Sequence, residues 1–301
     1  MKTVIGSFLL GVLPFSLAAQ EVSLDESLAL AKAELKFAPQ PKPQELDDHQ
    51  VSDVYQFKWK VDAPVIAAGT IWSLYAFTKV YDKPSSTIEE IEALDKNDIN
   101  GFDRWVAGKD DDKADKTSDL LFYGSMPLPA LLFIDKQMRK DALSIGLMYW
   151  ETFAVTGLLY TGSTYFTNRY RPESYNTDKP SWDRLGGGYK NSFFAGHVAL
   201  VGTSTFFTAK VYDDYHPDSK MKWVFYGGAA AATAYTAYLR LEAGKHFPSD
   251  ILVGTAVGVA SGILMPHWHK RRELKEQAWR IGPSYDPYSG GTGLSFTYSF
   301  K

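Results

Sequence analysis

Three short patches in the second half of the chain carry residue types that could together transfer a phosphoryl group. Their chemically active members are two arginines, two histidines and one aspartate: Arg171, Arg240, His197, His246 and Asp250. A guanidinium group matches phosphate oxygens two at a time, and an imidazole can act near neutral pH as nucleophile, acid or base. A carboxylate four residues after a histidine on a helix can orient the ring and stabilise its cation. The set predicts phosphoryl transfer without a metal.

The order and spacing of the patches resemble the signature of the type 2 phosphatidic acid phosphatase (PAP2) superfamily, which also contains the vanadium haloperoxidases. That signature reads Lys-x6-Arg-Pro, then Pro-Ser-Gly-His, then Ser-Arg-x5-His-x3-Asp. Arg171-Pro172 match the end of the first part, and Gly196-His197 match the end of the second. The third part matches at Arg240, His246 and Asp250, and the intervals of five and three residues between them are also the same. The resemblance covers roughly residues 60–268.

The chain departs from the signature at four positions. Thr164 stands where the family has its lysine, and Phe194 stands where it has its proline. The two serines are replaced by Ala195 and Leu239. One phosphate contact should therefore be weaker, unless Arg169 or Lys245 supplies the missing cation.

The resemblance assigns roles to the matching residues. His246 would attack phosphorus and become a phosphohistidine, with Asp250 as its partner, and His197 would protonate the leaving alkoxide and later activate water. The phosphate oxygens would be held by Arg171, Arg240, Gly196, Thr164 and Arg169. Taken alone, each of these residues also has an ordinary interpretation, such as a helix-capping histidine or an arginine in a surface ion pair. The combination favours the catalytic interpretation.

The elements that must position these residues are predicted to be helices. Apolar stretches recur six times, at Pro64–Val80, Leu120–Ile134, Ala142–Tyr160, Phe193–Phe207, Trp223–Leu239 and Ile251–Met265. They are rich in small residues, and their lengths are near or below the roughly 20 residues that a helix needs to cross a bilayer. Together with the resemblance they predict an all-α, six-helix bundle embedded in a membrane. A buried bundle in a soluble protein would have the same composition.

The remaining segments suggest an exported protein. Residues 1–20 resemble a secretory signal peptide, residues 21–62 are a polar segment and linker, residues 63–268 form the phosphatase-like domain, and residues 269–301 are a basic segment and tail. Alternation over Gly290–Phe300 indicates a β-strand. Basic clusters at Lys136–Lys140 and Lys270–Lys275 place the signature loops outside if basic flanks stay inside. A cleaved signal peptide followed by six crossings conflicts with that orientation.

Composition excludes some classes of function. The net charge of −3 gives no argument for nucleic acid, and the absence of cysteine excludes disulfide and thiolate chemistry. No cofactor is predicted, and the sequence carries no prediction of oligomeric state. The leading hypothesis is a phosphatase of the cell envelope acting on a lipid phosphomonoester or terminal pyrophosphate. Alternatives are a general soluble periplasmic acid phosphatase, a vanadate-dependent haloperoxidase, and a non-catalytic protein that binds anionic lipid headgroups.

Overall fold

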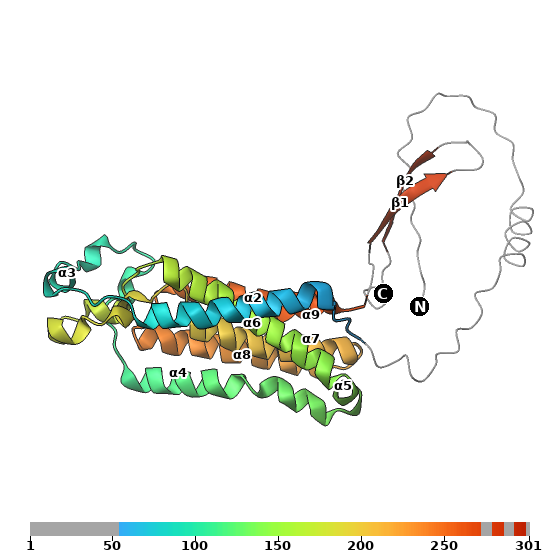
Figure 1. Cartoon of the computed structure of the whole chain (residues 1–301), viewed down its shortest axis with the longest axis horizontal. Coiled ribbons are helices and arrows are strands. Elements are labelled where there is room, and N and C mark those ends of the chain that lie inside the picture. Colours follow the sequence, from blue (N-terminus) through green and yellow to red (C-terminus); the bar gives the residue numbers. More distant parts are fainter. Residues whose placement is uncertain (1–53, 272–278, 286–291, 299–301) are drawn as a thin grey trace, which may run out of the picture. The chain divides into compact units, whose positions relative to one another are not determined.

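The structure, a computed structural model, describes residues 54–271, 279–285 and 292–298 (Figure 1). The predicted signal peptide and most of the predicted polar segment lie outside the described residues. Residues 54–271 form one helical unit. Its long helices are α2 Trp59–Tyr81, α4 Asp112–Ser125, α6 Ala142–Phe166, α7 Gly196–Tyr215, α8 Met221–Glu242 and α9 Pro248–His269. Each contains or overlaps one of the six predicted apolar stretches, so the prediction of an all-α bundle is confirmed.

Short elements connect the long helices. They are α3 Ile88–Glu92, α5 Lys136–Lys140 and the 3-10 turns η1 Lys96–Asp98, η2 Arg104–Val106, η3 Leu128–Ile134, η4 Pro172–Tyr175, η5 Ser181–Arg184 and η6 Gly187–Lys190. The connections from α2 to α4 and from α6 to α7 gather at one end of the bundle, whereas α5 lies at the other end (Figure 1). Two long irregular connections therefore meet where α7 and α9 begin.

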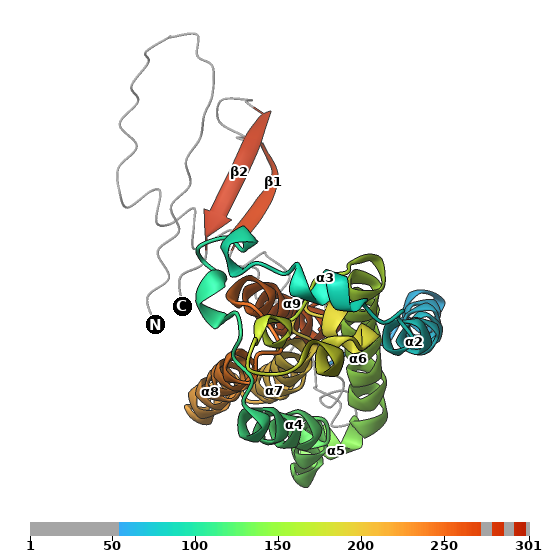
Figure 2. The same ribbon diagram turned by 90° about the vertical axis from the view of Figure 1, so that its left-hand side faces the viewer.

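Helix α7 is the centre of the bundle. It packs against α9, α8, α4 and α6, while α2 packs on the outer side of α6. The end-on view shows the same arrangement, with α2 at the edge (Figure 2). Fifteen of the 20 residues of α7 are buried, which explains why its apolar character continues around the helix instead of forming one stripe.

The bundle buries hydroxyl groups and exposes apolar side chains. Buried threonines of α6 and α7 donate to carbonyl groups one turn earlier, as Thr152 does to Met148 and Thr208 to Ser204. Large apolar side chains face outward, among them Ile71, Leu74, Leu120, Leu143, Trp223 and Leu252. Three segments are long and apolar enough to cross a membrane: Asp112–Ile134, Ala142–Phe166 and Pro248–His269. These features indicate membrane association.

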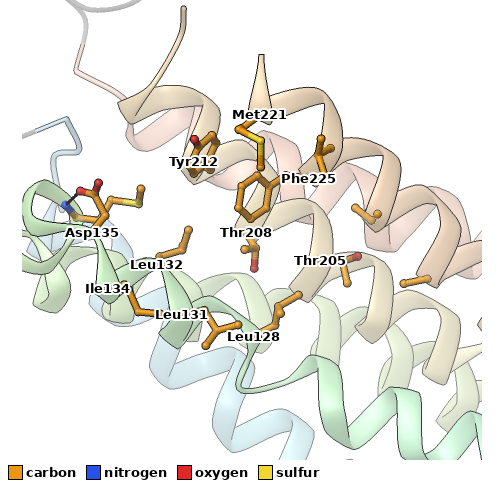
Figure 3. Close-up of a pocket in the computed structure, with 15 residues that line it drawn as sticks. Leu128, Leu131, Leu132, Ile134, Asp135, Thr205, Thr208, Tyr212, Met221 and Phe225 are labelled. Atoms are coloured by element: carbon orange, nitrogen blue, oxygen red, sulfur yellow. Dashed lines mark hydrogen bonds between the residues drawn. The ribbon is translucent and has the colours of Figure 1, made fainter. Parts of the chain in front are cut away.

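An apolar cavity of about 800 Å³ lies between η3, α7 and α8. Leucines of η3 face Tyr212 of α7 and Phe225 of α8 across it (Figure 3). Thr205 and Thr208 supply hydroxyl groups to its wall, but both donate to backbone carbonyls of α7. The wall is mostly apolar, with Asp135 as its one charged lining residue, so the cavity suits apolar groups.

The tail contains an antiparallel hairpin of two strands. Strand β1 (Trp279–Tyr285) pairs with β2 (Thr292–Tyr298), with Ile281 opposite Phe296. Strand β2 lies within the stretch whose alternation predicted a strand. Its partner β1 was not predicted, because Gly282 and Pro283 interrupt the apolar alternation.

Candidate active site

The four predicted cationic and imidazole groups come together at the end of the bundle where α7 and α9 begin. His197 lies in the first turn of α7, Arg240 in the last turn of α8, and His246 between α8 and α9. Arg171 immediately precedes η4. The charges of Arg240 and Arg171 act on both imidazoles, and the two imidazoles act on each other. Residues up to 75 positions apart in the sequence thus share one electrostatic environment.

The ring of His246 is held in its neutral form. Its ring is buried, and Nδ1 donates to the carbonyl of Ser192 at 2.6 Å, since a carbonyl can only accept. Burial, followed by the charges of Arg240 and Arg171, holds the pKa of His246 well below its usual value. A neutral ring with its proton on Nδ1 has its lone pair on Nε2. The nitrogen available for attack on phosphorus is therefore Nε2.

Asp250 reaches His246 through Ser192. The Ser192 hydroxyl donates to Asp250 Oδ2 at 2.7 Å, and the Ser192 carbonyl accepts from His246. The same carboxylate oxygen accepts the backbone N–H of Phe247 at 2.9 Å, which caps the first turn of α9. The sequence interpretation placed the carboxylate directly on the ring. The structure gives an indirect connection instead, because the carboxylate turns back toward its own helix start.

Arg169 binds carboxylates beside the start of α9. Its guanidinium donates to Asp250 and, at 2.7 Å, to Asp103, and it lies over the ring of Phe247 at 4.6 Å from the centroid. Asp103 also accepts from the backbone and hydroxyl groups of Ser249, at 2.9 and 2.7 Å. Arg169 thus joins the loop after α6 to the first turn of α9. Its predicted contact with phosphate stays a prediction.

Helix α4 contributes an acidic edge to the site. Asp119 Oδ1 accepts from His197 Nε2 at 2.9 Å, and Asp115 Oδ1 accepts from Arg240 at 2.5 Å. The Ser118 hydroxyl accepts from the same guanidinium at 3.0 Å. Because a carboxylate can only accept, Asp119 fixes a proton on His197 Nε2. These contacts compensate the buried charge of Arg240.

Glu173 joins two cations from different loops. Its Oε2 lies 2.7 Å from Lys245 Nζ, and its Oε1 lies 3.5 Å from Arg171. Lys245 is also 3.4 Å from Asp115. Arg171, Arg240 and Lys245 therefore surround the site with carboxylates between them, and the Nε atoms of both arginines are buried without a hydrogen-bond partner. This arrangement can bind an anion with several oxygens.

Comparison with known proteins agrees with this geometry. Residues 145–274 match the model of the PAP2 superfamily, a span that contains both histidines and both arginines. Over these residues the chain is similar to members of the PAP2 superfamily. Searches of curated proteins and of solved structures gave no match. The similarity supports phosphatase-type activity in general.

The departures from the PAP2 signature have structural consequences. Thr164 is buried, and its hydroxyl donates to the carbonyls of Tyr160 and Phe193 at 2.9 and 3.2 Å, so it fixes the segment before α7. Of the two residues that could replace the PAP2 lysine, Lys245 lies among the cations of the site. Gly196 is required by close packing, because a Cβ there would lie 2.6 Å from the ring of Tyr160.

Several site residues were not found from the sequence. They are Asp103, Asp115, Asp119, Glu173 and Ser192. Asp115 and Asp119 are separated by one helical turn, a signal that could have placed both on one face of a helix. Both precede the second apolar stretch, Leu120–Ile134, in the polar connection after the first stretch. Nothing local in the sequence links this connection to the histidines, since the contact between Asp119 and His197 spans 78 positions.

Proposed function

We propose that this protein hydrolyses a phosphomonoester or terminal pyrophosphate on a lipid of the cell envelope, through a phosphohistidine on His246. The observation that carries the proposal is the convergence of two imidazoles and two guanidinium groups at one end of an apolar bundle, where carboxylates of α4 and η4 connect them. Phosphatidate, phosphatidylglycerol phosphate, undecaprenyl diphosphate and a lipid A phosphate are the candidate substrates.

The first step forms a bond between His246 Nε2 and phosphorus and breaks the ester P–O bond. His197 acts as the imidazolium paired with Asp119: it gives one ring proton to the leaving alkoxide and becomes the neutral ring that serves as base in the second step. Arg171 and Arg240, with Lys245 as a third cation, stabilise the charge that spreads over the equatorial oxygens. In the second step His197 removes a proton from water, the water oxygen attacks phosphorus, and the bond to His246 breaks to release inorganic phosphate.

The lipid part of the proposal is supported by the apolar character of the bundle. Three helices are apolar enough to cross a membrane, and an apolar cavity between η3, α7 and α8, away from the site, has room for hydrocarbon. A soluble phosphoester would need neither feature. The second candidate, a general acid phosphatase, is favoured only if small soluble esters are hydrolysed as well as lipids.

The test is phosphate release by the purified full chain in detergent, without added metal, across the four lipids and a panel of soluble phosphoesters. His246→Ala should lose activity by more than about 1,000-fold, and Arg240→Lys should lose about 100-fold, since one oxyanion contact contributes this much. His216→Ala is the matched control, because His216 pairs with Asp135 at the opposite end of α7. Full activity of folded His246→Ala protein would refute the mechanism.

A further inference from the structure

A second cluster of metal-ligating side chains lies at the end of the bundle opposite the candidate active site. It consists of Asp62 in the first turn of α2, Glu151 in α6 and His269, the last residue of α9. Each is more than nine-tenths buried. Helix α9 begins beside His246, and its 22 residues span about 33 Å. The cluster is therefore separate from the phosphate chemistry.

The donor atoms have the spacing of a coordination shell. His269 Nε2 lies 3.0 Å from Glu151 Oε2 and 3.3 Å from Asp62 Oδ2. Zinc bonds to nitrogen and oxygen are about 2.0–2.2 Å long, so neighbouring donors in a tetrahedral or octahedral shell lie about 2.9–3.6 Å apart. Both distances fall in this range. One ion could thus contact all three side chains.

The histidine is oriented as a metal ligand. Its Nδ1 donates to the backbone carbonyl of Met265 at 2.8 Å, so the neutral ring has its lone pair on Nε2, toward the two carboxylates. A backbone carbonyl on the other ring nitrogen is the usual support of a metal-bound histidine. Glu151 Oε2 and His269 Nε2 are both fully buried and lie 3.0 Å apart. When the ring is neutral, its Nε2 lone pair faces a carboxylate oxygen at this depth, an arrangement that a cation between the two atoms stabilises.

Charge and space agree with this conclusion. Two carboxylates and a neutral imidazole carry a charge of −2, which a divalent ion neutralises, whereas a protonated imidazole would leave −1. The charged residues that line the adjoining cavity of about 390 Å³ are these three and the exposed Lys58. Ionisable groups inside apolar helices are costly and mark functional sites. The cavity leaves room for water or a further ligand on the metal.

We infer that Asp62, Glu151 and His269 bind one divalent transition-metal ion, which joins the ends of α2 and α9 to the middle of α6. A ligand set of one nitrogen and two carboxylates suits Zn²⁺ or Mn²⁺ better than Mg²⁺ or Ca²⁺, which prefer oxygen alone. The ion is structural in this assignment. It takes no part in the phosphoryl-transfer steps.

The experiment is a titration of the full chain with Zn²⁺ and, separately, Mn²⁺, after dialysis against chelator and removal of any histidine tag. Wild-type protein should bind one ion per chain, and its Tm should rise by roughly 5–10 °C at a metal concentration 100 times the Kd. Glu151→Gln keeps the shape of the side chain and should weaken binding at least about tenfold, which at the same metal concentration reduces the Tm shift to about half or less. Asp62→Asn is a second variant with the same expectation.

The controls separate this site from other histidines and from the phosphatase. His216→Gln, which removes a half-buried histidine beside a single carboxylate, and His246→Ala should bind metal as the wild type does. Failure of the phosphatase assay would therefore leave this inference standing. Absence of one-to-one binding at millimolar Zn²⁺ and Mn²⁺, or equal binding by wild type and Glu151→Gln, would overturn it and leave a buried imidazolium between two carboxylates.

Discussion

Two carboxylates one helical turn apart on α4 contact different members of the candidate site. Asp115 binds Arg240 and lies near Lys245, so it occupies groups that a phosphate would need. Asp119 binds His197, the proposed acid. Burial and the charges of Arg240 and Arg171 hold the pKa of His197 well below its usual value. The ring is therefore neutral in the free protein, and the negative charge of a bound phosphate together with Asp119 would favour its protonated form.

Neutralising Asp115 should therefore change the affinity for phosphate, whereas neutralising Asp119 should change the rate of the reaction. Asp115→Asn should lower the inhibition constant of inorganic phosphate roughly two- to fivefold with little change in kcat, because a partly exposed competitor for Arg240 is removed. Asp119→Asn should lower kcat at least about tenfold with little change in KM, because the proton donor is weakened. Steady-state kinetics with one lipid substrate measures both. The same effect from both variants would contradict this division of roles.

At this scale the sequence predicted the cationic and imidazole groups but not their carboxylate partners. Arg240 and His246 were recognisable because five residues separate them and their spacing is local. Asp119 and Glu173 were not, because each contacts a residue more than 70 positions away. The direction of Asp250 was also not predictable, since the same i+4 spacing permits either contact with the histidine ring or capping of the helix start.

Among the elements, α7 and α9 make the closest contact in the bundle. Gly254, Gly258 and Gly262 lie one turn apart on α9 and face the backbone of α7. A Cβ on Gly254 would lie 2.6 Å from the Ala195 carbonyl oxygen, and one on Gly262 would lie 2.8 Å from that of Thr203. Small residues at four-residue spacing allow this approach. The contact fixes Ala195, and hence His197, against the helix that follows His246.

Gly254→Ala should therefore affect stability and activity together. The added methyl group meets backbone that cannot move away, so the free energy of unfolding should fall by about 1–3 kcal/mol. Because Ala195 would shift, kcat should also fall. Gly227→Ala on α8 is the control: its Cβ would have no neighbour within 4 Å, and helix propensity predicts a gain of up to about 1 kcal/mol. Thermal unfolding and phosphate release measure the two effects, and equal stability of the variants would count against this packing.

The elements themselves were the most predictable part of the fold. Each apolar stretch became a helix, and Pro248 begins α9 as its place in a first turn predicted. The second stretch, Leu120–Ile134, is divided between α4 and η3, because Pro127 and Pro129 end regular hydrogen bonding there. The helix α4 also begins before its apolar part, at Asp112, where the Asp111 side chain caps it. Periodicity could not show these polar first two turns, which carry Asp115 and Asp119.

On the scale of the whole molecule, the two ends of the bundle differ in charge. The predicted basic clusters lie away from the candidate active site: Lys136–Lys140 form α5, and Lys270 and Arg271 follow the end of α9. The connection rich in acidic residues, between α2 and α4, lies at the site end (Figure 1). Basic flanks remain on the cytoplasmic side of a membrane. The charge distribution thus predicts that the candidate active site faces outward.

The absence of cysteine from the chain makes this orientation directly measurable. Helix α9 spans about 33 Å against a hydrocarbon core of about 30 Å, so residues at the two ends of the bundle should lie on opposite sides of the membrane. Asp178 is exposed near η5 at the site end, and Asp218 is exposed in the turn between α7 and α8 at the other end. Each can be replaced in turn, as Asp178→Cys and Asp218→Cys. An impermeant maleimide should label the first in intact spheroplasts and the second only after lysis.

Extraction with alkaline carbonate should leave both variants in the membrane pellet. Labelling of both before lysis, or release by carbonate, would show that the bundle does not cross the bilayer, and the reverse pattern would place the site inside.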